Sequence, residues 1–289
     1  MVHITGATKL LGVMGYPIEH SLSPVMHNAA LHALAAQTNT LEYVYIPWSV
    51  PLDALPAVVS SLGALGCCGF NVTIPHKQTI MPLLASTTVI AKAVGAVNTV
   101  WPTDAGWAGT NTDVQGFLAP LQNLDLDWST LTPCILGCGG AARAVLAGCA
   151  QLGCPQVHLV GRQADKLQQI QATSTLSLDI QVHLWPELAS ILPQASLLVN
   201  TTPIGMAPHP PTSPLSAVEM DQLPLEAIVY DLIYNPNPTL LLEQAKASGR
   251  RAITGVEMLV QQGAAALSLW IDQPAPVDVM RQALLAYFR

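Results

Sequence analysis

The chain has 289 residues, of which 51% are hydrophobic and only 10% are charged. This composition is typical of a folded protein with a large core, and it excludes an intrinsically disordered chain. The formal net charge of −7 argues against general binding to nucleic acid or to an anionic membrane. No stretch has the pattern of a membrane span, and residues 1–16 lack the features of a secretory signal, so we expect a cytoplasmic protein.

Short apolar runs alternate with helical patterns through the first part of the chain. This rhythm predicts β-α-β units, and hence a mostly parallel sheet with helical crossovers. The predicted strands are 10–14, 43–46, 67–72 and 96–101, and the predicted helices are 24–36, 52–62 and 76–84.

A second α/β unit is predicted from Pro133 onward, after a helix from Asp113 to about Asn123 that we expect to bridge two domains. The Pro-rich stretch 208–214 is predicted to be a surface loop or a lid. Two helices near the end, 256–270 and 277–287, have no strand partner of their own, and they can pack back onto the first unit. The strands predicted here are 134–136, 157–160, 180–184, 197–200 and 228–233. One further helix is opened by the segment 137–144 and reaches Gln151, and another is 164–172.

Three segments place polar groups at predicted helix starts. Lys77 follows the strand 67–72 and Pro75, where it is either a solvated lysine or an amine directed into a cleft. Asp113 follows two potential helix caps, and an acid is favourable at that end of a helix. Ser23 precedes Pro24 in the pattern of a capped helix start. Each segment is ordinary as capping chemistry, but together they offer the donors and acceptors that bind a polyhydroxylated acid.

The pattern Gly137-x-Gly139-x-x-Ala142 lies directly after a predicted strand and opens a helix. In a dinucleotide-binding loop the first glycine allows the tight turn, the second lets backbone approach the pyrophosphate, and the small third residue allows close helix packing. The helix start then presents free N–H groups to phosphate. The alternative is a plain glycine turn, but the strand-helix-strand context favours a dinucleotide site.

The end of the next strand predicts the choice of cofactor. An NAD enzyme usually places Asp or Glu there, whereas this chain has Arg162. The guanidinium suits the 2′-phosphate of NADP, so we predict NADP. Asp165 lies nearby and is the candidate ribose ligand if the cofactor is NAD.

The six cysteines show no paired Cys-x-x-Cys with histidines, and the eight histidines have no metal-ligand spacing. We therefore expect buried free thiols in a reducing compartment and no metal.

The ordered set of motifs resembles the shikimate dehydrogenase family from about Val13 to the carboxyl end. No single motif decides the resemblance, but their order and spacing do. Besides the segments above, they are Gly95–Thr99, Asn200–Met206, Tyr230–Pro236 and Gly255–Gln262.

The resemblance implies an α/β fold with two domains and a cleft between them. Residues 1–108 and 254–289 would form the substrate domain, and residues 109–253 a Rossmann-like NADP domain. The implied reaction is reversible NADPH-dependent reduction of 3-dehydroshikimate to shikimate by a cytoplasmic monomer or homodimer. The implied catalytic residues are Lys77 and Asp113; the substrate-binding residues are Ser21, Ser23, Thr73, Asn98, Tyr234 and Gln262; and the cofactor-binding residues are Gly137, Cys138, Gly139, Gly140, Ala141, Arg162, Thr202, Leu232, Gly255 and Met258.

One departure concerns the NADP loop, where the family commonly has Asn-Arg-Thr and this chain has Gly161-Arg162-Gln163. This leaves the strictness of NADP selection open. Quinate-preferring relatives tend to carry Thr where this chain has Ser23, which favours shikimate. The alternatives are a quinate/shikimate dehydrogenase with relaxed use of NAD, a methylene dehydrogenase of the folate type, and a non-catalytic NADP-binding regulator. Retention of Lys77 and Asp113 argues against the regulator.

Overall fold

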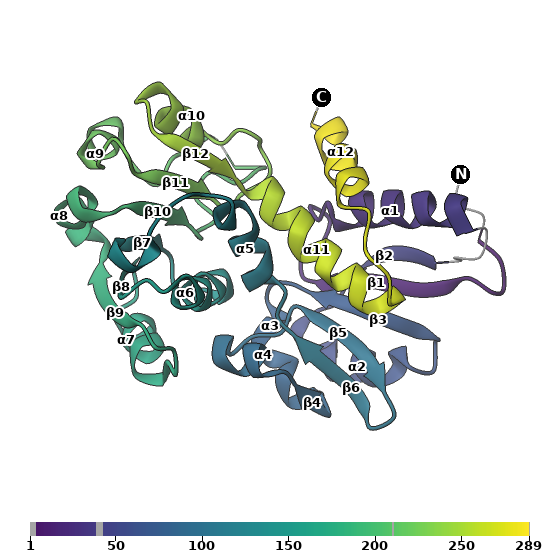
Figure 1. Cartoon of the computed structure of the whole chain (residues 1–289). Helices are drawn as coiled ribbons and strands as arrows, with labels where there is room; N and C mark the ends of the chain where they lie inside the picture. Colours follow the sequence, from purple (N-terminus) through teal and green to yellow (C-terminus); the bar gives the residue numbers. More distant parts are fainter. Residues whose placement is uncertain (1–3, 39–42, 210, 289) are drawn as a thin grey trace. The chain divides into compact units, whose positions relative to one another are not determined.

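The computed structural model describes residues 4–38, 43–209 and 211–288, which form two compact units (Figure 1). Unit 1 comprises Met1–Thr112 and Val260–Arg289, and unit 2 comprises Asp113–Leu259. Among the described residues, each unit contains one six-stranded sheet with helices packed on it, which confirms the predicted α/β class. The assignment of residues 1–108 and 254–289 to a substrate domain, and of residues 109–253 to a cofactor domain, stays a prediction.

The sheet of unit 1 is mixed, with the strand order β2-β1-β3-β5-β6-β4. Strand β1 pairs in parallel with β2 and β3, whereas β5 and β6 form an antiparallel pair beside β3. The sheet therefore agrees with the mostly parallel prediction only at its β2-β1-β3 side and at β4. The strands are β1 (Lys9–Gly15), β2 (Tyr43–Ser49), β3 (Cys67–Val72), β4 (Ser86–Thr87), β5 (Thr99–Thr103) and β6 (Gly106–Thr110).

Three predictions in unit 1 need correction. The helix expected over 52–62 begins as a 3₁₀ turn, Leu52–Ala54, and becomes an α-helix only from Leu55. The strand expected from Ala96 begins at Thr99, because helix α4 (Val89–Val94) ends at Gly95 with φ 67° and the chain then turns into the sheet. The helix expected over 76–84 divides into α3 (His76–Thr79) and a 3₁₀ turn, Met81–Leu83. Pro82 explains the division, since it has no N–H to continue an α-helix.

Helices cover both faces of this sheet, as the alternation of side chains along β3 requires. Phe70 packs in a core with Leu55 and Val59 of α2 (Leu55–Leu62). On the opposite face, a Cβ at Gly69 would lie 2.3 Å from Trp270. Only glycine therefore lets α11 (Gly255–Ile271) approach the strand so closely.

The last helix, α12 (Val277–Tyr287), packs against α1 (Ser23–Thr38), beside which Figure 1 shows it. Both α12 and residues 260–271 of α11 belong to unit 1. The carboxyl-terminal helices therefore return to the first unit, as the sequence suggests.

The sheet of unit 2 is parallel throughout, with the order β12-β11-β10-β7-β8-β9. Numbered within the unit, this is the order of dinucleotide-binding folds, which bind their ligand outside the carboxyl ends of the strands, where the order reverses between β7 and β10. The strands are β7 (Pro133–Leu136), β8 (Gln156–Gly161), β9 (Asp179–Leu184), β10 (Leu197–Asn200), β11 (Ile228–Asp231) and β12 (Arg251–Thr254).

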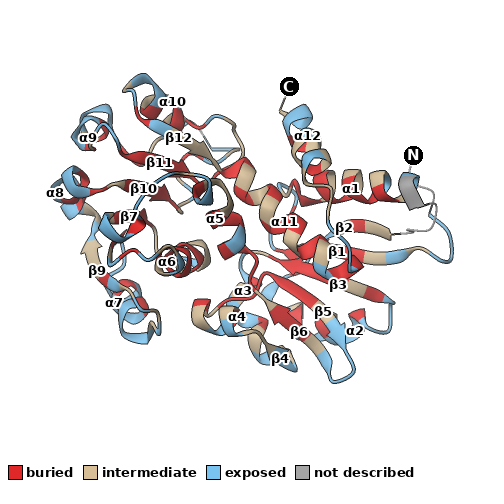
Figure 2. Cartoon of the chain, in the orientation of Figure 1, coloured by how far each residue is buried: buried red, intermediate tan, exposed pale blue. Residues whose placement is uncertain are grey.

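Buried apolar strands form the centre of unit 2, where β7, β10 and β11 are buried along their whole length (Figure 2). On one face, Phe117 of α5 stacks on Tyr230 with ring centroids 5.5 Å apart. Leu188, Met220 and Leu241 pack in the core on the other face. The helices are α5 (Asp113–Gln122), α6 (Gly140–Leu152), α7 (Ala164–Thr173), α8 (Leu188–Ile191), α9 (Ala217–Gln222) and α10 (Leu240–Ala247).

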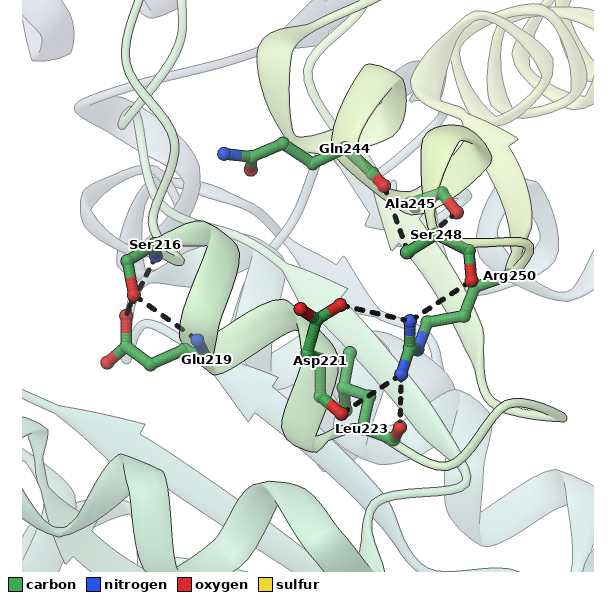
Figure 3. A network of polar contacts seen from close by, with 8 residues as sticks. All are labelled: Ser216, Glu219, Asp221, Leu223, Gln244, Ala245, Ser248 and Arg250. Atoms are coloured by element: carbon green, nitrogen blue, oxygen red, sulfur yellow. Dashed lines mark hydrogen bonds and ion pairs between the residues drawn. The ribbon is translucent and has the colours of Figure 1, made fainter.

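Arg250 is a structural arginine near the end of α9 (Figure 3). Its side chain is 8% exposed, and one terminal nitrogen donates to the carbonyl of Leu223 at 2.5 Å and to that of Asp221 at 3.3 Å. The other donates to the carbonyl of Ser248 at 3.2 Å. A cation there satisfies carbonyls that a helix end leaves without partners. The arginine thereby ties α9 to the turn after α10.

Candidate active site

Polar residues gather at the carboxyl edge of the unit 1 sheet, after β1 and β3. Thr73 follows β3 directly, and its N–H donates to the carbonyl of Met14 at the end of β1 (2.9 Å). Lys77 is the second residue of α3, and its carbonyl accepts from the N–H of Val97 (2.8 Å). The lysine is partly exposed. Backbone hydrogen bonds thus fix Thr73 and Lys77 at the end of two adjacent parallel strands.

Asn98 is the centre of a buried polar network in unit 1. Its side chain is 2% exposed, and its oxygen accepts from the N–H of Thr112 at 2.8 Å. Its amide nitrogen donates to the hydroxyl of Thr112 at 3.0 Å and to the side-chain oxygen of Gln262 at 3.4 Å. The structure therefore brings Asn98 and Gln262 together, although 164 residues separate them in the chain.

Ser21 lies between β1 and α1, and the N–H of Ser23, at the start of α1, donates to the Ser21 hydroxyl at 3.4 Å. The sequence pattern predicts Ser23 as a cap that precedes the helix. In the structure Ser23 is instead the first residue of α1, and its hydroxyl hydrogen-bonds the phenol of Tyr45. Tertiary packing across β2 thus replaces the local capping contact, because Tyr45 brings a buried polar group within reach.

The glycine loop of unit 2 has different requirements at its two glycines. Gly137 has φ 108°, and a Cβ there would lie 2.5 Å from the hydroxyl of Thr201. Gly139 has φ −90°, and a Cβ there would meet nothing within 4 Å. The fold therefore requires glycine at 137 but leaves open space beside 139. Ala142 is fully buried, as close helix packing requires.

The start of α6 fits a phosphate group. Gly139 precedes this helix without any side-chain capping bond, and Cys138, Gly140 and Ala141 are partly buried around it. The first N–H groups of a helix lack intrahelical acceptors and carry a positive partial charge. With the open space at Gly139, the residues present can hold the pyrophosphate of a dinucleotide.

Arg162 is exposed directly after β8, and Gln163 precedes α7 without a side-chain capping bond. A Cβ at Gly161 would lie 3.1 Å from a methyl group of Leu167. A larger residue at 161 would require Leu167 to shift. Packing against α7 thus explains why a glycine stands at position 161. Arg162 is the cationic side chain at the end of β8.

Asn200 and Asp231 connect the ends of β10 and β11, and they belong to the motifs Asn200–Met206 and Tyr230–Pro236 that carry the family resemblance. Each is fully buried, and the Asn200 amide donates to the Asp231 carboxyl at 3.0 Å. The Thr202 hydroxyl donates to Asn200 at 2.7 Å, and the Thr239 hydroxyl donates to Asp231 at 2.7 Å. Burial raises the pKa of Asp231 to about 6, despite these hydrogen bonds. The signal in the sequence is a polar residue that ends each buried strand.

Three further predicted cofactor residues lie near this connection. The N–H of Leu232 donates to the carbonyl of Asn200 at 3.1 Å. A Cβ at Gly255 would lie 2.3 Å from the carbonyl oxygen of Leu232, so only glycine fits at the start of α11. Met258 is buried one turn further along that helix. The structure therefore brings Thr202, Leu232 and Gly255 to one region of unit 2.

The two remaining predicted site residues of unit 2 are Asp113 and Tyr234. Asp113 is the first residue of α5, as predicted, and is 6% exposed. Tyr234 follows β11 and is partly buried, and burial raises its pKa. Across the part of the chain that the structure describes, no group of three or more His, Cys, Asp or Glu is placed to hold a metal ion. No helix in the same residues is long and apolar enough to cross a membrane.

Comparisons with known proteins agree with this geometry. Residues 13–100 match the shikimate dehydrogenase substrate-binding domain, and residues 255–285 match the shikimate 5′-dehydrogenase C-terminal domain. The chain is 55% identical to the shikimate dehydrogenase (NADP⁺) of Synechocystis sp. over 288 residues, which covers 99% of this chain and 98% of that protein. The chain belongs to the shikimate dehydrogenase family. Its fold is the two-domain α/β fold of that family.

Solved structures support the assignment and widen the range of substrates to consider. The shikimate 5-dehydrogenase of Thermus thermophilus, solved in complex with NADP(H) and shikimate, is 33% identical with a TM-score of 0.82. The alignment covers 96% of this chain and 99% of that one. The 5-ketofructose reductase of a Gluconobacter species is 30% identical with a TM-score of 0.85, covering 98% and 100% of the two chains. The same fold therefore occurs both in a protein named shikimate 5-dehydrogenase and in one named 5-ketofructose reductase.

Proposed function

We propose that this protein is a shikimate dehydrogenase, which catalyses the reversible NADPH-dependent reduction of 3-dehydroshikimate to shikimate. The observation that carries the proposal is the combination of two local sites in a chain 55% identical to such an enzyme. One is the open glycine loop at Gly139, and the other is the polar edge with Lys77 and Asn98. A cofactor-binding regulator would need only the first.

The substrate would be held by residues of the polar edge and their neighbours. Hydroxyl and amide groups suit a substrate that carries a carboxylate and several hydroxyls, because each can donate or accept a hydrogen bond. Ser21 and Ser23 would bind the carboxylate. The remaining contacts would come from Thr73, Asn98, Tyr234 and Gln262.

The cofactor would be held by unit 2, with the pyrophosphate at Gly137–Ala141 and the 2′-phosphate at Arg162. Thr202, Leu232, Gly255 and Met258 would line the path toward the nicotinamide. When bound, NADP supplies or accepts the hydride at its nicotinamide ring.

The protein's own chemical task is to move one proton. Reduction of the ketone creates a developing alkoxide, which needs an adjacent proton donor. Lys77 and Asp113 would form the acid-base pair, with Lys77 giving the proton to the substrate oxygen and Asp113 holding a neighbouring hydroxyl. Two interacting groups share their titration, so the pair, rather than either residue, would set the pH dependence.

The test is to measure NADPH absorbance with the purified protein, using shikimate and quinate with NADP and NAD in all four combinations. Turnover restricted to shikimate and NADP supports the proposal. Comparable turnover of quinate, or comparable use of NAD, would favour a quinate/shikimate dehydrogenase instead. Adding 5-ketofructose tests the activity named for the Gluconobacter structure.

Arg162 carries the prediction on cofactor choice. We expect Arg162→Ala to raise the KM for NADP by about tenfold to a hundredfold, as for the loss of a hydrogen bond to a charged group. The KM for NAD should stay nearly constant, and high salt should weaken the wild-type preference in the same direction, because an exposed ion pair is screened. Arg251→Ala, which removes another exposed arginine of unit 2, is the control. Equal losses for both cofactors would indicate a structural arginine.

Ser23 carries the prediction on substrate choice. Ser23→Thr keeps the hydroxyl but adds a methyl group at a position that is 7% exposed. We expect the ratio of kcat/KM for quinate to kcat/KM for shikimate to rise. The rise should correspond to a change of roughly 1–3 kcal/mol in relative activation free energy, as for a single methyl group in a pocket. The measurement compares this ratio in the variant and in the wild type. An unchanged ratio would show that this serine does not control the choice.

Three finer points belong to the same proposal. We infer a cytoplasmic enzyme of aromatic amino-acid biosynthesis that works as a monomer or homodimer. Residues 1–108 and 254–289 would act as the substrate domain, and residues 109–253 as the cofactor domain. Size-exclusion chromatography with light scattering measures the oligomeric state directly.

A further inference from the structure

Tyr45 is a fully buried tyrosine on β2 that belongs to none of the roles above. It is 1% exposed, and its ring stacks on His27 of α1 with centroids 4.1 Å apart and planes within 3°. Trp270 of α11 packs at a tilt on the same ring, 6.1 Å between centroids. Elements from both ends of the chain therefore fix the ring and hold its hydroxyl at one place.

The phenol oxygen lies between two polar side chains. It donates to the side-chain oxygen of Asn71 at 2.7 Å, and the Ser23 hydroxyl hydrogen-bonds it from the other side. Burial raises the pKa of Tyr45, so the phenol keeps its proton. Tyr45 thus joins the start of α1 to the end of β3.

The direction of each hydrogen bond follows from the far side of Asn71. Its amide nitrogen donates to the carbonyl of Asn98 at 3.0 Å, and a carbonyl can only accept. The side-chain oxygen of Asn71 must then face Tyr45, so the phenol must donate to it. The phenol oxygen is left as an acceptor, and Ser23 is its donor in the protein without substrate. The chain of hydrogen bonds therefore has one direction, from Ser23 through Tyr45 to Asn71.

The chain of hydrogen bonds continues from Asn71 to Asn98. Besides the Asn98 carbonyl, its amide nitrogen reaches the hydroxyl of Thr99 at 3.1 Å, which in turn donates to the side-chain oxygen of Asn98 at 3.0 Å. Asn71 and Thr99 are 5% and 0% exposed, so water cannot replace these partners. A buried polar group that loses its partner is costly, and this makes the chain rigid.

We propose that Tyr45 is a positioning residue, which fixes the Asn98 side chain through Asn71 and Thr99. The inference rests on the proposed function, in which Asn98 binds the substrate. It assigns no contact with the substrate to Tyr45. Its effect is to hold the Asn98 amide in place before the substrate arrives.

Tyr45→Phe tests the inference, because it removes one oxygen and keeps the stacked ring. We expect the KM for shikimate to rise about threefold to tenfold, as for the loss of one or two buried hydrogen bonds, with kcat and the KM for NADP within about twofold of the wild type. Tyr43→Phe is the matched control, since Tyr43 lies on the same strand, partly buried beneath Lys9, and should leave all three values unchanged.

A double-mutant cycle distinguishes positioning from general loosening. If Tyr45 acts through Asn71, the substitution should cost less in an Asn71→Ala background than in the wild type. Thr99→Val breaks the same chain at its far end and gives the same KM readout if Tyr45→Phe does not fold. A lower melting temperature with unchanged KM, or an equal rise of both KM values, would overturn the inference. Absence of wild-type turnover with shikimate would instead refute the proposed function, and the inference with it.

Discussion

Replacement of Lys77 by alanine should reduce kcat by about 10²–10⁴-fold, the usual contribution of one positioned acid-base group. The fold should persist, because the contact that places Lys77 in the sheet edge is made by its backbone carbonyl, which accepts from Val97 at 2.8 Å. Alanine keeps that carbonyl and also favours the helix. The measurement is steady-state kinetics in both directions, together with NADP binding followed by fluorescence or calorimetry.

Lys92→Ala serves as the matched control for Lys77→Ala. Lys92 is an exposed lysine on a helix of the same unit, and its removal changes the net charge by the same amount. We expect kcat to be unchanged in this variant. Near-normal turnover of Lys77→Ala would remove the lysine from the reaction and make it an ordinary solvated side chain. A loss of NADP affinity equal to the loss of kcat would point to misfolding instead.

Gly139→Val should abolish most activity by a different route, the loss of cofactor binding. The backbone at Gly139 has φ −90° and ψ −167°, which a β-branched residue adopts without strain, and open space surrounds the missing side chain. In the proposed complex the pyrophosphate of NADP occupies that space, so the valine side chain would displace the pyrophosphate. We expect kcat/KM for NADP to fall by about 10²-fold or more, since small misplacements of a bound group have effects of this size.

The melting temperature distinguishes the two ways in which Gly139→Val could fail. Without cofactor, we expect it to match the wild type, and we expect NADP to stabilise the wild type but not the variant. Gly63→Val adds the same side chain at another position with φ −62° and nothing within 4 Å, and it should keep full activity. Normal NADP binding by Gly139→Val would show that the glycine loop does not hold the pyrophosphate.

Gly137 shows why both glycines should not be tested in the same way. Its φ of 108° and the closeness of the Thr201 hydroxyl mean that any side chain there strains the protein itself. Lost activity in a Gly137 variant would therefore not report on the cofactor. The sequence pattern predicts a tight turn at the first glycine and room for the pyrophosphate at the second, and the geometry of Gly137 and Gly139 is consistent with that division.

Many elements could be predicted because their signals are local. Strands β3 and β10 and helix α12 have the bounds that apolar runs and helical periodicity predict. The parallel sheet of unit 2 follows from strands that are apolar throughout and alternate with helices. The shorter elements β4 and β6 escaped prediction, because two residues of β4 and the glycines of β6 give no periodic pattern.

The sequence by itself determined the fold class and the glycine loop, which depend on local patterns of strands, helices and glycines. The resemblance to a family, carried by motifs along nearly the whole chain, supplied the identity of the residues proposed to act. Only the tertiary structure decided how distant residues combine. Asn98 meets Gln262 from the far end of the chain, and Ser23 bonds Tyr45 instead of capping its own helix. The connection of Asn200 to Asp231 likewise depends on two strands that lie side by side. The physical reason is that a buried polar side chain must find a partner, and the partner is whichever group packing brings within about 3 Å.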